Sequence, residues 1–420
     1  MAGRPKRILL GRTVALRPVA ATFSLFGAFW GGWAVAAVDL ERALRLSHAG
    51  YGLLLAAALA GAAGANAVGG ALAERRGTAP ILSAALAAWA GLLVASALAR
   101  APGLLTAALV LTVVAGGLVD VAMNVAATAA LAGSPGELVR FHARFNAGAA
   151  IGAGAMGVLL ASGASWRWGW LAAGTGAAAL VAVCGRATLP ASGPGEPIRF
   201  LDTVGVLRRE ALVLVAIAFG AGAMVEGGVD LWGVLYLRTH LSAGLAIGAT
   251  SAVVGYLIAT VTRVVLGPAA GRRGPGAGVA AGAGTAAAGV VLLAFAPTWL
   301  AGAGLVLAAG GVSLCWPLLL AQAGTGRDRP AAIVGSVSAV GYIGLVLGPA
   351  MVGWVAAAAG LRAGLLLLAA AALFVAVTPM LSARRGARHG STESRPVRAG
   401  AESAVPVTGG ERSPQDGSTS

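Results

Sequence analysis

The sequence predicts an all-α membrane protein with twelve transmembrane helices in two parallel six-helix repeats. Three observations support this prediction: an apolar composition, a series of apolar runs of membrane length, and a turn motif that occurs twice. Of the 420 residues, 58% are hydrophobic and 11% are charged, and the mean hydropathy is +0.84. A soluble protein would carry about 25% charged residues. A soluble helical core therefore fits this composition poorly.

Apolar runs of about 20 residues cross the ~30 Å hydrocarbon layer as helices. Such runs follow one another along the chain, separated by short turns that contain Arg, Gly, Pro or Ser. The first run is too long for the apolar region of a cleaved signal peptide, which has about 7–15 residues. The predicted spans are 18–38, 50–73, 79–99, 104–131, 140–162, 168–183, 211–237, 243–267, 276–296, 299–323, 331–357 and 361–381.

The repeated turn fixes how the spans are grouped. It reads Gly70-Ala-Leu72-Ala-Glu74-Arg75-Arg76-Gly77, and it returns roughly 195 residues later as Gly267-Pro-Ala-Ala-Gly271-Arg272-Arg273-Gly274. Two further pairs keep nearly the same offset, namely Gly116-Gly117 with Gly310-Gly311 and Arg167-x-Gly169 with Arg362-x-Gly364. Because each repeat contains an even number of helices, both copies have the same orientation in the membrane, as in two-lobed transporters.

The positions of the basic residues predict the orientation. The formal net charge is +15, and most of the 30 Lys and Arg fall in the termini and the even-numbered turns. Under the positive-inside rule these segments are cytoplasmic, so both termini lie inside, and this placement argues against a nucleic-acid partner. We expect a multi-pass protein of the bacterial inner membrane. We expect two six-helix lobes, at 18–185 and 211–382, joined by a cytoplasmic linker at 186–210. A basic N-terminal tail at 1–17 and a disordered cytoplasmic tail at 383–420 flank them.

The motifs resemble those of the major facilitator superfamily, whose turn between the second and third helices reads Gly-x-Leu-Ala-Asp-Arg-x-Gly. Here the turn has Glu74 in place of Asp. The resemblance implies a gating turn, in which Gly70 lets two helices touch and the basic residues lie at the headgroups. We assign to it Gly70, Leu72, Glu74, Arg75, Gly77, Arg272, Arg273 and Gly274.

The fourth and fifth helices are similar to the fucose-permease-like branch of that family and its uncharacterised bacterial members. The similarity lies in Gly116-Gly-Leu118-Val-Asp120-Val-Ala-Met-Asn124 and Phe141-His142-Ala-Arg144-Phe145-Asn146. In the fucose permease the fourth-helix acid serves proton coupling, so the resemblance implies that role for Asp120. The alternative for Asp120 is a neutral acid that is hydrogen-bonded to a neighbouring helix.

Ionisable groups inside the membrane are costly and mark functional sites. Glu226 and Asp230 are four residues apart and share one helix face, so they can hold a proton between them. The alternative is that Asp230 pairs with Arg238 or Arg45. Arg263 is expected to pair locally or with a helix C-terminus.

Other polar and aromatic residues complete the candidate site. Trp30, Asn124 and Asn146 are candidates for substrate binding, although the two amides could also tie helices together. His142 and Arg144 could form an inner gate with Glu137 or Asp120, or an interfacial pair at the membrane surface.

The sequence favours a proton-coupled secondary transporter that functions as a monomer and imports a small polar solute, either sugar-like or another metabolite. Efflux of drugs or metabolites is the alternative, and a membrane sensor or enzyme is a remote one. We find no metal-ligand cluster and no nucleophile–base pair, and Gly152-x-Gly154-x-x-Gly157 lies in an apolar run with no preceding strand, unlike a dinucleotide site. We therefore expect no cofactor, no enzymatic activity, and the proton gradient as the energy source.

Overall fold

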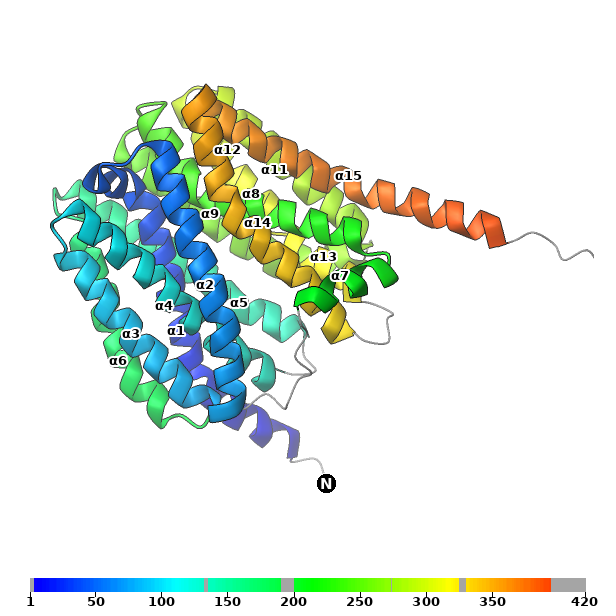
Figure 1. Cartoon of the computed structure of the whole chain (residues 1–420), viewed down its shortest axis with the longest axis horizontal. Coiled ribbons are helices and arrows are strands. Elements are labelled where there is room, and N and C mark those ends of the chain that lie inside the picture. Colours follow the sequence, from blue (N-terminus) through cyan, green and yellow to red (C-terminus); the bar gives the residue numbers. More distant parts are fainter. Residues whose placement is uncertain (1–3, 132–134, 190–199, 273, 325–329, 394–420) are drawn as a thin grey trace, which may run out of the picture. The chain divides into compact units, whose positions relative to one another are not determined.

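The computed structural model describes residues 4–131, 135–189, 200–272, 274–324 and 330–393, which form helices joined by short turns (Figure 1). The first six helices are α1 (Arg4–Leu44), α2 (His48–Arg76), α3 (Thr78–Leu98), α4 (Pro102–Ala130), α5 (Pro135–Ala161) and α6 (Arg167–Arg186). The later ones are α7 (Phe200–Arg209), α8 (Val213–Thr239), α9 (Leu245–Val261), η1 (Thr262–Leu266), α10 (Gly267–Arg272), α11 (Pro275–Phe295), α12 (Thr298–Val312), α13 (Cys315–Gly324), α14 (Pro330–Ala359) and α15 (Leu361–Glu393).

Twelve stretches among the described residues are long and apolar enough to cross a membrane, and they coincide closely with the twelve predicted spans. A helix is the expected form because hydrocarbon offers no hydrogen-bond partner to a free backbone group. The prediction of an all-α membrane protein is confirmed. The spans are Leu16–Leu44, His48–Ala73, Thr78–Leu98, Pro102–Ala130, Arg140–Ala161, Arg167–Arg186, Val213–Thr239, Leu245–Ala270, Pro275–Phe295, Thr298–Ala323, Ser336–Ala359 and Leu361–Leu381.

The predicted duplication is visible in the turns. Gly77 and Gly274 occupy equivalent places in the two copies of the motif, and both have positive φ, at 87° and 105°. Gly163 and Gly360, which also lie at equivalent places, have φ of 79° and 86°. Glycine adopts this conformation without steric cost. The backbone therefore repeats where the side chains have diverged.

Helix packing repeats as well. In the first half α1 packs along α5, and in the second half their counterparts α8 and α14 pack in the same way. Each contact depends on glycine, because a Cβ on Gly152 would lie 1.9 Å from the carbonyl oxygen of Ala28, and one on Gly344 would lie 1.9 Å from that of Gly220. Small residues at such places let helix backbones approach closely in the membrane.

The structure corrects or extends the expectations at three places. Gly70 was expected to let two helices touch, but the close contact between α2 and α4 lies at Gly117. A Cβ on Gly117 would meet the Ala62 carbonyl oxygen at 2.3 Å, whereas one on Gly70 would only touch the Val121 side chain at 3.5 Å. The linker contains the helix α7, while its residues 190–199 lie outside the described part. Helix α15 continues to Glu393, so the first residues of the expected disordered tail are helical, and 394–420 lie outside the described residues.

Because successive spans alternate in direction, the bundle has two membrane faces. We call the one that carries the turns 44–48, 98–102, 161–167, 239–245, 295–298 and 359–361 the odd-turn face. The opposite one, at which the first span begins, is the even-turn face.

Candidate functional site

A cavity of about 760 Å³ lies between the two repeats, and both contribute to its wall. Six of the predicted site residues line it together: Trp30, Asp120, Asn124, His142, Glu226 and Asp230. The rest of the wall is mainly apolar and aromatic, with Phe23, Phe26, Phe145, Trp316 and Tyr342 among its members. The cavity thus places a few charged and amide groups in an apolar surrounding, which is the usual make-up of a small-molecule site.

Asp120 on α4 is held by amide groups from two helices. The Nδ2 atom of Asn66 on α2 donates to its Oδ2 at 3.0 Å, and the Nδ2 atom of Asn124 donates to its Oδ1 at 2.9 Å. Asn124 also donates to the backbone carbonyl of Asp120 at 2.9 Å. Both carboxylate oxygens therefore accept hydrogen bonds from N–H groups.

His142 extends this network from α5. Its Nε2 atom lies 2.8 Å from Oδ1 of Asn124, and its Nδ1 atom lies 2.8 Å from the carbonyl oxygen of Leu138. The ring also packs edge-on against Phe23, with centroids 5.2 Å apart. Asn124 therefore bridges Asp120 and His142 and joins the fourth span to the fifth.

The same cluster reaches the second repeat. Asn66 donates to the hydroxyl of Tyr342 on α14 at 3.4 Å, while it also holds Asp120. Sequence reasoning missed both Asn66 and Tyr342. An amide in the glycine- and alanine-rich second span was the available signal for Asn66, because polar groups in such spans are unusual.

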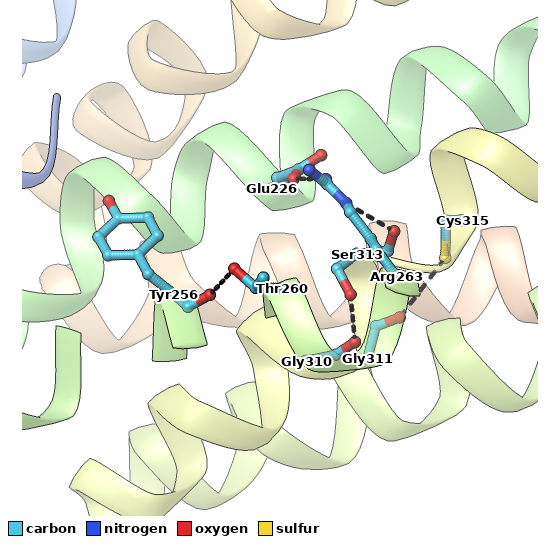
Figure 2. A network of polar contacts seen from close by, with 8 residues as sticks. All are labelled: Glu226, Tyr256, Thr260, Arg263, Gly310, Gly311, Ser313 and Cys315. Atoms are coloured by element: carbon cyan, nitrogen blue, oxygen red, sulfur yellow. Dashed lines mark hydrogen bonds and ion pairs between the residues drawn. The ribbon is translucent and has the colours of Figure 1, made fainter. Parts of the chain in front are cut away.

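A second polar cluster joins three spans of the second repeat (Figure 2). The Arg263 guanidinium, in η1, forms an ion pair with Glu226 on α8 through Nη2. Its Nε atom donates to the carbonyl oxygen of Ser313 at 3.1 Å. Ser313 caps the C-terminus of α12, so the expectation that Arg263 pairs with a helix C-terminus agrees with this contact; the pair with Glu226 was missed.

Prolines explain the backbone at this cluster. Pro317 lacks the N–H that would bond to Ser313 four residues earlier, so the tenth span breaks between α12 and α13 and leaves the Ser313 carbonyl free for Arg263. Pro268 likewise donates no hydrogen bond, and before it the eighth span widens into the π-helix η1, where the N–H of Gly267 bonds to Thr262 five residues back. Such π-helical turns often occur at functional sites.

Asp230 lies one helical turn beyond Glu226 and lines the same cavity. Its carboxyl makes no hydrogen bond or ion pair with the described residues. Arg238, considered as its partner, instead binds Asp39 at 2.9 Å. Asp230 is therefore the cavity carboxyl without a direct protein partner in the described structure.

Several predicted residues lie away from the cavity. Asn146 is buried on α5 outside the lining, and Arg144 is exposed with its guanidinium 4.7 Å from the Phe141 ring. His142 and Arg144 thus face different surroundings. Of the gating turn, Arg75 and Arg272 are exposed at the even-turn face, while Arg273 and the side chain of Glu74 lie outside what the structure describes.

Contacts between the repeats concentrate toward the odd-turn face. Trp33 on α1 donates from Nε1 to the hydroxyl of Tyr51 on α2 at 2.8 Å, and the Tyr51 ring packs edge-on against Trp232 on α8 with centroids 5.8 Å apart. All three side chains are fully buried. The cavity wall, by contrast, reaches Leu138 and Leu320 near the even-turn face. The cavity is therefore blocked on the odd-turn side and approaches the even-turn side.

Comparisons with known proteins agree with this arrangement. A family model described as Major Facilitator Superfamily matches residues 19–326. Among solved structures, a nucleoside transporter, NupG, has a TM-score of 0.70 at 13% identity, covering 87% of this chain and 99% of that one. A bacterial homologue of the human lysosomal transporter Spinster, inward-facing and unoccupied, has a TM-score of 0.71 at 16% identity and covers 90% of this chain and 98% of that one.

A D-xylose–proton symporter has a TM-score of 0.67 at 16% identity, with 87% of this chain and 97% of that chain covered. At these identities the likeness shows the fold alone. No curated protein gives a significant match.

Proposed function

Because the chain belongs to the major facilitator superfamily, we propose that it is a proton-coupled secondary transporter that imports a small polar solute by alternating access. It is a multi-pass membrane transporter and not an enzyme. The observation that supports the proposal best is the cavity that both repeats line, with carboxyl, amide and guanidinium groups among aromatic rings. The nucleoside and xylose transporters with this fold support a polar, hydroxyl-rich solute as the cargo.

The distribution of basic residues supports an orientation for this cycle. Under the positive-inside rule the even-turn face is cytoplasmic in a bacterial inner membrane, with both termini inside. In this orientation the contacts at the odd-turn face close the cavity to the outside, and the cavity extends toward the cytoplasmic side. The two repeats would rock about the cavity to reach the opposite state, as a monomer.

Asp120 is the proposed coupling site, with Glu226 and Asp230 as further candidates. Its carboxyl lies between two amides that can support it as an anion, and it faces the cavity that substrate would enter. A proton that crosses the membrane with the solute gains about 2.3 kcal/mol per 100 mV, which supports a roughly 50-fold gradient.

Export of an amphipathic drug or metabolite is the second candidate. Trp30, Phe26, Phe145 and Trp316 give the cavity a largely aromatic wall that an apolar compound could fill. The direction of net transport under an imposed pH gradient separates the two candidates.

The test begins with a thermal-shift screen of sugars, nucleosides and other small metabolites on the purified protein. Hits are then assayed in proteoliposomes with an imposed pH gradient. Asp120→Asn should abolish gradient-driven accumulation and preserve counterflow exchange, because exchange requires no net proton release. Glu137→Gln serves as the control and should accumulate solute normally, because this carboxyl, considered for the inner gate, is exposed, lies outside the cavity lining and pairs with neither His142 nor Arg144 in the described structure. Full accumulation by Asp120→Asn would remove Asp120 from the coupling mechanism.

A further inference from the structure

His142, considered from the sequence for an inner gate or an interfacial pair, is bound through both of its ring nitrogens. Its two ring nitrogens face oxygens at 2.8 Å, one on the backbone of Leu138 and one on the side chain of Asn124. A backbone carbonyl only accepts, so Nδ1 must donate to Leu138. The charge of the ring then depends on whether Nε2 also carries a hydrogen and donates to Asn124.

The orientation of the Asn124 amide determines whether Nε2 of His142 is a donor. The nitrogen of this amide must face Asp120, because the backbone carbonyl of Asp120 at 2.9 Å can only accept a hydrogen bond. The amide oxygen therefore faces His142, and Nε2 must donate to it. An imidazole that donates from both nitrogens is the imidazolium cation.

Asp120 shows the complementary pattern. Each of its carboxylate oxygens accepts from an amide nitrogen, at 3.0 Å from Asn66 and at 2.9 Å from Asn124. A carboxylate with N–H donors on both oxygens is favoured as the anion. The pattern of donors and acceptors thus describes a cation and an anion joined by one amide.

We propose that His142 is the acceptor of the proton that Asp120 releases when the cavity faces the even-turn side. This inference rests on the proposed function. In the step, the O–H bond of protonated Asp120 breaks and an N–H bond forms on neutral His142, with cavity water as the carrier because the amide of Asn124 transfers no proton. A neutral pair becomes an ion pair, and the proton count is unchanged.

The positions of the two residues give the step a direction. Asp120 lies ten residues before the end of α4 at Ala130, or ~15 Å from the even-turn face at 1.5 Å per residue. His142 lies at the start of the fifth span, which begins at Arg140 on that face. The proton therefore moves from the middle of the bundle toward the even-turn face, from which His142 releases it.

No other charged group near His142 in the described structure takes the place of Asp120 as its partner. On the elements packed against α5, Asp120 is joined to it through Asn124 from α4, and Arg263 acts on it from η1 as a positive charge that disfavours the imidazolium. Arg263 is itself paired with Glu226. The helix α1 presents the Phe23 ring. Asp120 is thus the carboxylate joined to His142 by hydrogen bonds.

Nitrogen-15 NMR of histidine-labelled protein tests the charge state without any transport assay. The chain has four His, and His142→Gln identifies the signal of interest. At about pH 7.5, one unit above the ordinary imidazole pKa of about 6.5, His142 should carry protons on both nitrogens. Asp120→Asn should convert it to the neutral ring. Glu41→Gln, at a carboxylate that pairs with His48 inside the first repeat, should leave it unchanged. A neutral His142 in the unmodified protein, or an imidazolium that persists in Asp120→Asn, would overturn the proposal.

Transport kinetics give a second readout. His142→Gln should lower the initial rate of gradient-driven uptake at least tenfold but preserve the final accumulation ratio, because a relay sets a rate and not the stoichiometry. His240→Gln, at an exposed histidine, should behave as the unmodified protein. An initial rate for His142→Gln equal to that of His240→Gln counts against the relay. Normal accumulation by Asp120→Asn would instead contradict the coupling role of Asp120, and the NMR result would still decide the charge of His142.

Discussion

The guanidinium of Arg238 lies 2.9 Å from the carboxylate of Asp39, and the same Nη1 atom donates to the backbone carbonyl of Val35 at 2.9 Å. This contact ties α8 of the second repeat to α1 of the first at the odd-turn face. In the proposed alternating-access cycle, this link opens when the cavity turns from the even-turn face to the odd-turn face. Sequence reasoning considered Arg238 only as a partner for Asp230.

Breaking this pair should shift the conformational equilibrium. Asp39→Asn removes the charge attraction, and because the two side chains are 26% and 14% exposed we expect an effect of only about 1 kcal/mol, or roughly fivefold in the ratio of the two conformations. Spin labels at Ser162 and His240, one on each repeat at the odd-turn face, would report it as a larger population of long distances. The native cysteines, Cys184 and Cys315, are both buried and would first be replaced.

A charge-reversed double variant, Asp39→Arg with Arg238→Asp, provides the control. It restores the attraction and should return part of the population to the short distance. If Asp39→Asn leaves the distance distribution unchanged, the ion pair does not help to close this face.

Gly52 makes a second contact between the repeats at the odd-turn face. A Cβ on Gly52 would lie 2.6 Å from the carbonyl oxygen of Pro349 and 3.1 Å from Cα of Gly353. Gly52→Ala should therefore force α2 and α14 apart, at a cost to the closed conformation of roughly 1–3 kcal/mol. The same pair of spin labels should show the odd-turn face opening.

Gly64→Ala is the matched control for this substitution. Gly64 lies in the same helix, and a Cβ there would meet nothing within 4 Å. Both variants gain the same intrinsic helix propensity, so a difference between them reports the contact alone. Equal distance distributions for the two variants would show that the close approach at Gly52 is unimportant for closure.

The spans could be predicted from the sequence because the hydrophobic signal is local. Each run of about 20 apolar residues is sufficient to predict a membrane helix, and the repeated turn motif predicts how the helices are grouped. The break in the tenth span and the π-helix in the eighth were not predicted, although Pro317 and Pro268 mark these two places. A proline inside an apolar run does not disclose whether the helix merely bends or breaks, since that depends on which side chain takes the free carbonyl.

The site was predictable where one helix determines it. Asp120 and Asn124 are four residues apart, as are Glu226 and Asp230, so each pair had to share a helix face, and each lines the cavity. Contacts between distant spans were not predictable, because no local pattern records that Asn66 meets Asp120. Asn146 shows the same limit, since its residue type favours a polar site but its side chain lies outside the cavity lining.

The ion pair between Glu226 and Arg263 should stabilise the second repeat. Glu226→Gln removes the carboxylate that pairs with the Arg263 guanidinium, so this cation stays in the cavity wall with neutral oxygens such as the Ser313 carbonyl in place of an anion. The side chains are 25% and 16% exposed, so we expect a loss of about 1–3 kcal/mol, less than for a fully buried pair. A thermal-shift assay of the purified protein should show a lower melting temperature.

The double variant Glu226→Gln with Arg263→Gln separates the pair from the individual side chains. With neither charge left unpaired, it should be more stable than the less stable of the two single variants. If the effects of the two single substitutions simply add, Glu226 and Arg263 are not coupled.

The last prediction concerns the membrane face on which each turn of the chain lies. Arg76 and Arg272 are exposed at equivalent turns of the two repeats, while Arg100 and Ser162 are exposed at the opposite face. Single cysteines at these four positions, in a chain without its native cysteines, would be treated with a membrane-impermeant thiol reagent in intact cells. We expect labelling at 100 and 162 from outside, and labelling at 76 and 272 only after the membrane is opened. Because an even number of spans separates Arg76 from Arg272, labelling of these two from opposite sides would contradict the parallel repeat itself. Labelling of both from outside would reverse the orientation that the basic residues predict, and with it the direction in which His142 releases its proton.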